Sequence, residues 1–178
     1  MRKLKVTELN RIDVPQFKAA AKTPLVVVLD NVRSMYNVGS VFRTADSFRL
    51  EKILLCGITA CPPHPEIHKT ALGAEESMEW ESCESALEAV EKLHFGGYEV
   101  YALEQVENSI QLQNFKTEKG RKYAIILGNE VKGVSQEAVN ACDGAIEIPQ
   151  FGTKHSMNVS VSGGIAIWHF ASQLLGLQ

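Results

Sequence analysis

The chain has 178 residues, of which 45% are hydrophobic and 22% are charged, and its formal net charge is −3. This length suits one domain with a sizeable core, and the mildly acidic balance argues against a broad positive surface that holds nucleic acid. No apolar run approaches the roughly 18 residues that a membrane span needs, and the charged N-terminus lacks the apolar core of a signal peptide. We therefore expect a cytoplasmic protein without a membrane segment.

Strand and helix patterns alternate along the chain. The β-branched run at residues 25–30 is typical of a strand covered on both faces. A helix pattern follows from Val38 to Phe48, with apolar residues at i, i+3 and i+4, and Asn37 occupies the expected N-cap position. Further strands are predicted at residues 53–57, 98–103, 123–128 and 145–148.

Three more helices complete the expected order. They are predicted at residues 85–93, at residues 135–141, and from residue 157 or 160 to about residue 175. The Pro-rich segment 59–65 is typical of a loop. Strands that alternate with helices predict an α/β fold, with a mostly parallel, doubly wound sheet and helices on both faces. Residues 1–23 are expected to form a short basic extension before a single domain at residues 24–178.

Several common ligand motifs are missing. No G-x-G-x-x-G follows the first strand, and the G-x-x-x-x-G at residues 128–133 lacks the lysine of a P-loop. His64 and His68 have the i, i+4 spacing of a metal pair, but Pro65 interrupts them and no other His or Cys is suitably spaced. We therefore expect a surface loop at this place and no metal site.

Three polar segments follow predicted strands. The first contains Asn37 and Arg43; its arginine could hold a phosphate, or it could pair with Asp46 while Asn37 caps the helix. The second, residues 128–133, places a carboxylate between two glycines, which permits close backbone approach to a ligand or makes a tight turn. The third, residues 156–160, is a polar ligand site or a plain helix cap.

These three segments, in this order, resemble the motifs of the SpoU (TrmH-like) branch of the SPOUT methyltransferases. The matching residues are Asn37-x-Gly-x-x-x-Arg43, Gly128-Asn-Glu130-x-x-Gly133 and Ile148-Pro149 with Ser156-Met-Asn158-x-Ser160, and the resemblance spans about residues 24–176. Members of this family transfer a methyl group from S-adenosylmethionine to a ribose 2′-hydroxyl of tRNA or rRNA. The resemblance therefore implies such an enzyme, a homodimer, and a deep trefoil knot at the C-terminus.

The resemblance also implies roles for particular residues. Arg43 resembles the catalytic arginine that works with the RNA phosphate to activate the 2′-hydroxyl. Glu130 resembles the acid that orients Asn37 or Arg43, whereas Ser156 and Asn158 resemble the pair that lines the reaction centre. The positions expected to bind S-adenosylmethionine are Leu103, Glu104, Leu127, Gly128, Asn129, Gly133, Ile148, Pro149 and Met157.

RNA binding is assigned to local basic residues, because only the short extension is expected outside the domain. The candidates are Arg2, Lys3, Lys5, Arg11, Arg33, Arg49, Lys132 and Lys154. Such residues recognise shape, phosphate and 2′-hydroxyl groups rather than the base edges of a duplex. The four candidates at the N-terminus are equally compatible with a solvated chain end.

A dimer is predicted independently from two apolar helices. The side chains of Val38, Val41, Phe42 and Phe48 and the segment 165–175 are more apolar than one sheet face requires. Two other functions remain open. One is a catalytically inactive, cofactor- and RNA-binding assembly factor of the same fold, against which the intact motifs argue. The other is an unrelated α/β enzyme for a small phosphorylated substrate.

Overall fold

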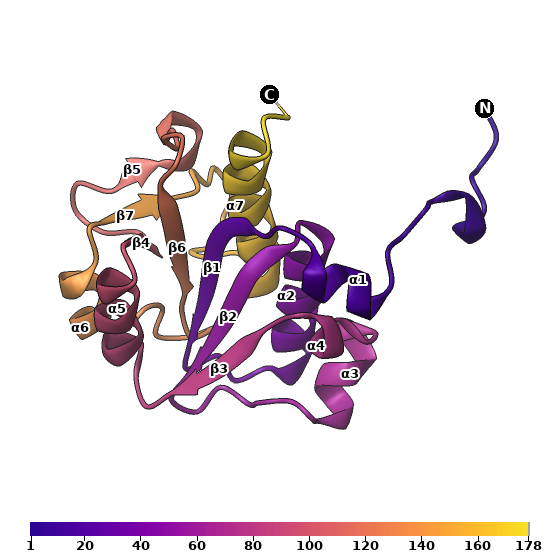
Figure 1. Ribbon diagram of the computed structural model, residues 1–178. Coiled ribbons are helices and arrows are strands. Elements are labelled where there is room, and N and C mark those ends of the chain that lie inside the picture. Colours follow the sequence, from indigo (N-terminus) through magenta and orange to yellow (C-terminus); the bar gives the residue numbers. More distant parts are fainter. Residues whose placement is uncertain (178) are drawn as a thin grey trace.

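The computed structural model describes residues 1–177, and its centre is a seven-stranded sheet in the order β3-β2-β1-β6-β4-β7-β5 (Figure 1). The strands are β1 (Thr23–Asp30), β2 (Leu50–Cys56), β3 (Trp80–Cys83), β4 (Tyr98–Leu103), β5 (Ile110–Gln111), β6 (Lys122–Leu127) and β7 (Gly144–Glu147). Every pair of neighbouring strands is parallel, which confirms the predicted α/β class. The two edge strands β3 and β5 were not predicted, because they are too short to show an alternating or apolar pattern.

Helices cover both faces of this sheet. They are α1 (Val14–Ala19), α2 (Met35–Ser47), α3 (Pro65–Ala71), α4 (Ala74–Ser77), α5 (Ala86–Phe95), α6 (Gln136–Ala141) and α7 (Val159–Leu174), with the short 3-10 helices η1 (Val6–Glu8) and η2 (Leu112–Asn114). The helices α2, α3 and α7 contribute to one apolar core, and α5 and α6 contribute to the other. Neither α3 nor α4 was predicted, and the expected loop ends at Pro65, where a helix tolerates proline.

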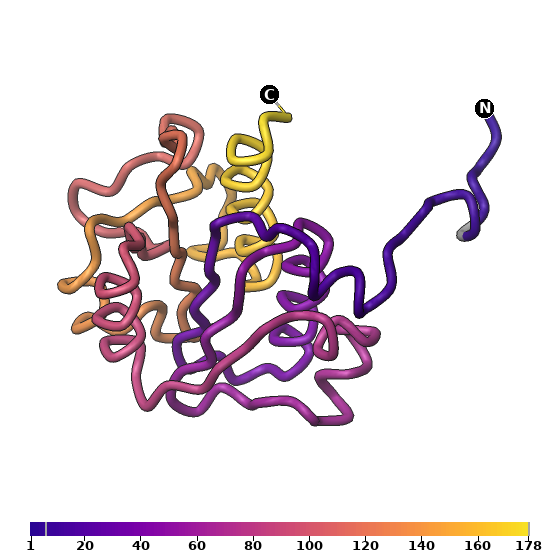
Figure 2. The backbone as a smooth tube through the Cα atoms, viewed as in Figure 1, coloured from indigo at the N-terminus to yellow at the C-terminus, as the bar shows by residue number. Residues whose placement is uncertain are grey.

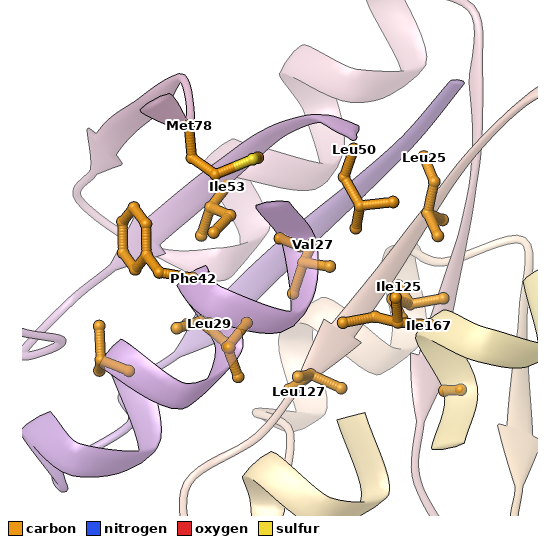
Figure 3. Packing of buried hydrophobic residues seen from close by; sticks show 14 of the residues in the cluster. Leu25, Val27, Leu29, Phe42, Leu50, Ile53, Met78, Ile125, Leu127 and Ile167 are labelled. Carbon is orange, nitrogen blue, oxygen red and sulfur yellow. The ribbon is translucent and has the colours of Figure 1, made fainter. Parts of the chain in front are cut away.

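The strand β1 explains why both faces are covered. Its residues Leu25, Val27 and Leu29 belong to the first core, whereas Val26 and Val28 belong to the second. Successive side chains of a strand point to opposite faces, so a continuous β-branched run places apolar groups on both. Figure 3 shows the first of these cores, in which side chains of β1, β2 and β6 meet those of α2 and α7.

Of the two helices predicted to form a dimer, α2 packs its apolar side chains inside its own chain. Val38, Val41 and Phe42 of α2 are 0 to 1% exposed in the first core, so the expectation that they face a partner was wrong. They are buried because α2 packs against both the sheet and α3, and not against the sheet alone. The helix α7 keeps an exposed apolar side, which includes Ile165 and Trp168.

Two helix starts differ from the sequence prediction. The helix α2 is capped by Ser34, whose hydroxyl accepts a hydrogen bond from the Asn37 N–H, so Asn37 is not the N-cap. Asn37 lies in the first turn, and its buried side chain is free for other contacts. The helix α7 is capped by Asn158, which accepts from the N–H groups of Ser160 and Val161. Its first residue thus falls between the two predicted starts.

The N-terminal residues behave as two parts. The N-terminal segment before α1 leads away from the body (Figure 2), and its residues 1–5 and 7–12 are exposed. The helix α1 that follows has an Asp13 cap and docks next to α4, with Phe17 buried in the first core. None of the helices within residues 1–177 combines the length and the apolar content needed to cross a bilayer.

The strand order determines where a ligand site can form. Because β6 lies between β1 and β4, and β7 lies beside β4, the carboxyl ends of these four parallel strands are neighbours. The segments that leave them, at residues 31–34, 104–109, 128–135 and 148–158, therefore meet at one edge of the sheet. Ligands of open parallel sheets bind at such an edge.

Candidate active site at the carboxyl edge of the sheet

A cavity of about 310 Å³ lies among the segments that follow β4, β6 and β7. All the positions predicted to bind the cofactor line it except Pro149, although both neighbours of that proline do. Glu130 and Ser156, predicted to be catalytic, also line the cavity. The volume lies in the range of small-molecule sites, roughly 300 to 1,000 Å³.

The turn after β6 is built on two glycines. Asn129 and Gly133 exchange backbone hydrogen bonds of 3.0 and 2.9 Å, which closes the turn. A Cβ atom on Gly128 would lie 2.1 Å from the carbonyl carbon of Gly133, so no side chain fits there. Gly133 has φ +70°, and its Cβ would lie 2.1 Å from Glu104 Oε2. Both positions therefore require glycine.

Side chains fasten this turn to the neighbouring strand ends. Glu104, just after β4, accepts a hydrogen bond from the Val134 N–H at 3.0 Å. Asn129 donates from Nδ2 to the carbonyl oxygen of Asn31, just after β1, at 2.7 Å. Asp30, the last residue of β1, accepts from the Ser135 N–H at 2.7 Å. The ends of β1, β4 and β6 are thus held together by polar contacts.

Glu130 joins this turn to the start of α2. One carboxylate oxygen accepts from the Ser34 N–H and from Asn37 Nδ2, at 2.9 and 3.0 Å, and the other accepts from the Arg33 N–H at 3.0 Å. Burial alone would raise the pKa of Glu130, but these hydrogen bonds outweigh it and hold the pKa below its ordinary value. Glu130 is therefore ionised at neutral pH and acts as an acceptor.

Asn37 connects the second predicted motif with the third. Its Oδ1 accepts hydrogen bonds from Asn158 Nδ2 at 3.1 Å and from the Ser160 hydroxyl at 3.3 Å, while its Nδ2 donates to Glu130. Asn158 is also the N-cap of α7, so the same side chain caps the helix and contacts the site. Side chains from three distant parts of the sequence thus form one hydrogen-bond network beside the cavity.

Arg43 lies apart from this network. It is exposed on α2, about two helical turns after Asn37, and it does not line the cavity. In the part of the chain that the structure describes, its guanidinium has no hydrogen bond and no ion pair. The alternative pairing with Asp46 does not form, and the Asp46 carboxylate instead accepts from the Ser77 hydroxyl at 2.6 Å. One chain alone therefore does not bring Arg43 to the cavity.

The predicted RNA-binding residues are all exposed. They are Arg2, Lys3, Lys5, Arg11, Arg33, Arg49, Lys132 and Lys154. Lys132 lines the cavity, and Arg33 and Lys154 belong to segments at the same edge of the sheet. The four N-terminal residues lie on the segment before α1, where Arg2 pairs with Glu8. Their role in RNA binding stays a prediction.

Some residues of the cavity wall were missed by sequence reasoning. Gln105, Glu147, Gln150 and His155 line it beside the predicted positions. Gln105 also donates from Nε2 to the His155 carbonyl oxygen at 3.3 Å, which links the segments after β4 and β7. Their only sequence signal is adjacency to the motifs.

The histidines with metal-pair spacing have other contacts. The His64 ring accepts from the Glu66 N–H at the start of α3, and His68 pairs with Glu75. Within residues 1–177, no cluster of three or more His, Cys, Asp or Glu side chains could hold a metal ion.

A parallel sheet with helices on both faces places the chain in the doubly wound α/β class, and its cavity lies at the edge where ligands of that class bind. Residues 24–168 match the SpoU rRNA Methylase family, and because this match covers most of the sequence, the chain belongs to that family.

Curated relatives extend over nearly the whole chain. The 23S rRNA (guanosine-2′-O-)-methyltransferase RlmB of Vibrio parahaemolyticus is 28% identical over 169 residues, or 94% of this chain and 67% of that protein. RlmB of Xanthomonas axonopodis is 26% identical over 89% of this chain and 63% of its own length. The chain thus spans about two thirds of the length of these relatives.

Solved structures share the same fold. The TrmH/SpoU tRNA modifying enzyme of A. aeolicus aligns with a TM-score of 0.80 and 21% identity, over 92% of this chain and 83% of that one. An AdoMet-bound rRNA methyltransferase of Sinorhizobium meliloti aligns with a TM-score of 0.77 and 23% identity, over 87% and 61% of the two chains. At these identities the likeness supports the fold.

Proposed function

We propose that the chain is an S-adenosylmethionine-dependent RNA methyltransferase that methylates a ribose 2′-hydroxyl of tRNA or rRNA. The observation that carries this proposal is the network in which Asn37 connects Glu130 with Asn158, beside the cavity. The network joins residues from all three motifs, and family membership gives it its chemical meaning.

The cavity wall fits S-adenosylmethionine. Gly128 and Gly133 line the cavity with backbone alone, and Leu103, Ile148 and Met157 offer apolar surface for an adenine ring. The carboxylates of Glu104 and Glu147 border the same space and suit a cationic ligand. When bound, the cofactor supplies an electrophilic methyl group on a sulfonium centre.

The residues of the chain chiefly position the reacting groups. Glu130 accepts three hydrogen bonds and has a lowered pKa, so it orients Asn37 and the start of α2 rather than removing a proton. The Arg43 guanidinium lowers the cost of ionising the 2′-hydroxyl, whose proton passes to the RNA phosphate. Ser156 borders the cavity where the ribose enters. Alignment of the hydroxyl with the methyl group supplies most of the rate enhancement.

A homodimer completes the active site. Arg43 lies outside the cavity of its own chain, so the arginine that serves each cavity comes from a second copy. The exposed apolar stripe on α7 supports such pairing, because Val161, Ile165 and Trp168 lie on one side of that helix. An unpaired stripe of this kind is unfavourable in water.

The C-terminal segment is knotted in this proposal. Strand β7 enters the sheet between β4 and β5, and the chain then reaches α7 beside the connection from β5 to β6. That connection contacts α7 through the Thr117 N–H, which donates to Gln173 Oε1 at 3.0 Å.

The protein works in the cytoplasm, where tRNA and rRNA are methylated.

Transfer of tritiated methyl groups to total RNA tests the function. The wild-type chain should bind S-adenosylmethionine in isothermal titration and label RNA, and the label should appear as 2′-O-methylnucleosides after digestion. Cofactor binding without transfer to any RNA would instead indicate an inactive RNA-binding assembly factor. Absence of salt-dependent RNA binding would favour an enzyme for a small phosphorylated substrate.

A further inference from the structure

The loop between β7 and α7 carries an aromatic ring that packs against nothing. Phe151 is 96% exposed, and among residues 1–177 only Phe95, at the end of α5, matches it as an exposed aromatic side chain. Burial of a phenylalanine side chain stabilises a fold, and this chain gains no such stabilisation at position 151. The ring therefore has no role in the core of the chain.

The loop that carries this ring borders the cavity. Gln150, directly before Phe151, and His155 and Ser156, shortly after it, all line the cavity. The hydrogen bond from Gln105 to the His155 carbonyl oxygen ties the loop to the segment after β4. Phe151 thus belongs to a short loop whose two ends both border the cavity.

Chemistry suited to single-stranded RNA surrounds the ring. Lys154 is exposed in the same loop, and a Cβ atom on Gly152, directly after Phe151, would meet nothing within 4 Å, so the loop is open to a ligand at that point. An aromatic ring and a cation on one exposed loop suit an unpaired nucleotide, which is held by stacking and by phosphate contact.

We infer that Phe151 is the stacking platform for the base of the nucleotide whose ribose is methylated. This inference rests on the proposed function, because a ribose that presents its 2′-hydroxyl to the cavity carries its base at the rim. Stacking accepts any base, so Phe151 positions the nucleotide without selecting its identity. Phe151 is therefore a binding residue for the substrate and not for the cofactor.

Replacement of the ring tests this role. Phe151→Ala should weaken RNA binding and raise KM for RNA about five- to a hundredfold, the usual effect of losing one aromatic stack. Phe151→Trp should restore both values, because it keeps an aromatic face. Phe95→Ala is the matched control, since it removes an equally exposed ring outside the cavity. S-adenosylmethionine affinity without RNA should stay within twofold in all three variants.

An abasic substrate identifies the contact. Once the methylated nucleotide is mapped, an RNA without a base at that nucleotide should bind wild type and Phe151→Ala equally. The deficit of Phe151→Ala on intact RNA should also be the same at low and high salt, whereas Lys154→Ala should reduce the salt slope by about one.

The possible outcomes separate the two proposals. If the wild type labels RNA and Phe151→Ala binds and labels it equally well, the stacking role is wrong and the proposed function stands. Loss of cofactor affinity in Phe151→Ala, or a deficit that persists on abasic RNA, would also overturn the stacking role. If the wild type transfers no methyl group to any RNA, the proposed function fails and this inference fails with it.

Discussion

The cavity and the exposed face around Arg43 differ in how firmly one chain holds them. At the cavity, Glu104, Asn129 and Glu130 each have hydrogen-bond partners on a neighbouring segment. On the exposed face, the Arg43 guanidinium has none in the part of the chain that the structure describes.

The two proposed ligands, a small cofactor and an RNA, differ in size, and this accounts for the difference between the ordered cavity and the exposed face. A small cofactor offers few groups, so its affinity depends on a site that is ordered before binding. An RNA brings its own phosphates and bases, and cations that lack protein partners can contact them without breaking existing ion pairs. We therefore expect substitutions at the cavity to change cofactor affinity and stability, and substitutions on the exposed face to change RNA methylation.

The largest expected effect belongs to Arg43→Ala. Methyl transfer should fall by about a hundredfold or more, because the group that stabilises the developing oxyanion is lost. S-adenosylmethionine affinity, measured by titration, should stay within a few-fold. Lys18→Ala, which removes an exposed cation on α1, should leave both values unchanged. Equal loss of transfer and cofactor binding would contradict the assigned role.

Trp168→Glu should separate the proposed dimer. The side chain is 51% exposed on the apolar stripe of α7, and a carboxylate there would be buried without a partner in an interface. Light scattering at micromolar concentration should give a dimer mass for wild type and a monomer mass for the variant, which should also lose methyl transfer. Phe95→Glu should remain dimeric. A monomeric wild type would refute the arrangement.

Gly133→Ala should disrupt the cofactor cavity and leave the exposed face around Arg43 unchanged. Its positive φ costs an alanine about 1 to 3 kcal/mol, and the new Cβ would displace Glu104. Thermal unfolding should shift down, and cofactor affinity should drop. An unchanged affinity in Gly133→Ala would show that Glu104 does not fix the turn.

Glu130→Gln should lower stability to an extent that depends on pH. Loss of the charged acceptor should lower the free energy of unfolding by about 1 to 3 kcal/mol at pH 7. Because the pKa of Glu130 is lowered by folding, its contribution is complete above its ordinary value and disappears as pH falls through the folded value. Urea unfolding at pH 7, 5 and 3 should therefore show a shrinking difference.

A matched carboxylate controls for general charge effects. Glu137→Gln alters an exposed residue in the first turn of α6, and it should change unfolding little at any of these pH values. If the gap between wild type and Glu130→Gln stayed constant down to pH 3, the network would not depend on the ionised carboxylate.

The sequence by itself determined the class of fold and the places where polar residues follow strands. The apolar run at β1 predicted a strand covered on both sides, and the run at β6 predicted a strand, since such patterns depend only on local side-chain chemistry. The two glycines after β6 indicated either a tight turn or close approach of the backbone to a ligand, and the structure contains the turn. Short elements such as β5 were not predicted, because a segment of two residues shows no periodic pattern of apolar side chains.

Only the tertiary structure decided how the motif residues are used. Asn37 has the sequence signature of a helix cap, yet Ser34 takes that place and Asn37 bonds to Glu130 and Asn158, 93 and 121 residues away. Those contacts require β6 to lie beside β1, and such strand order arises from packing of the whole chain, which no local pattern encodes. The same packing leaves Arg43 outside the cavity and Phe151 exposed at its rim.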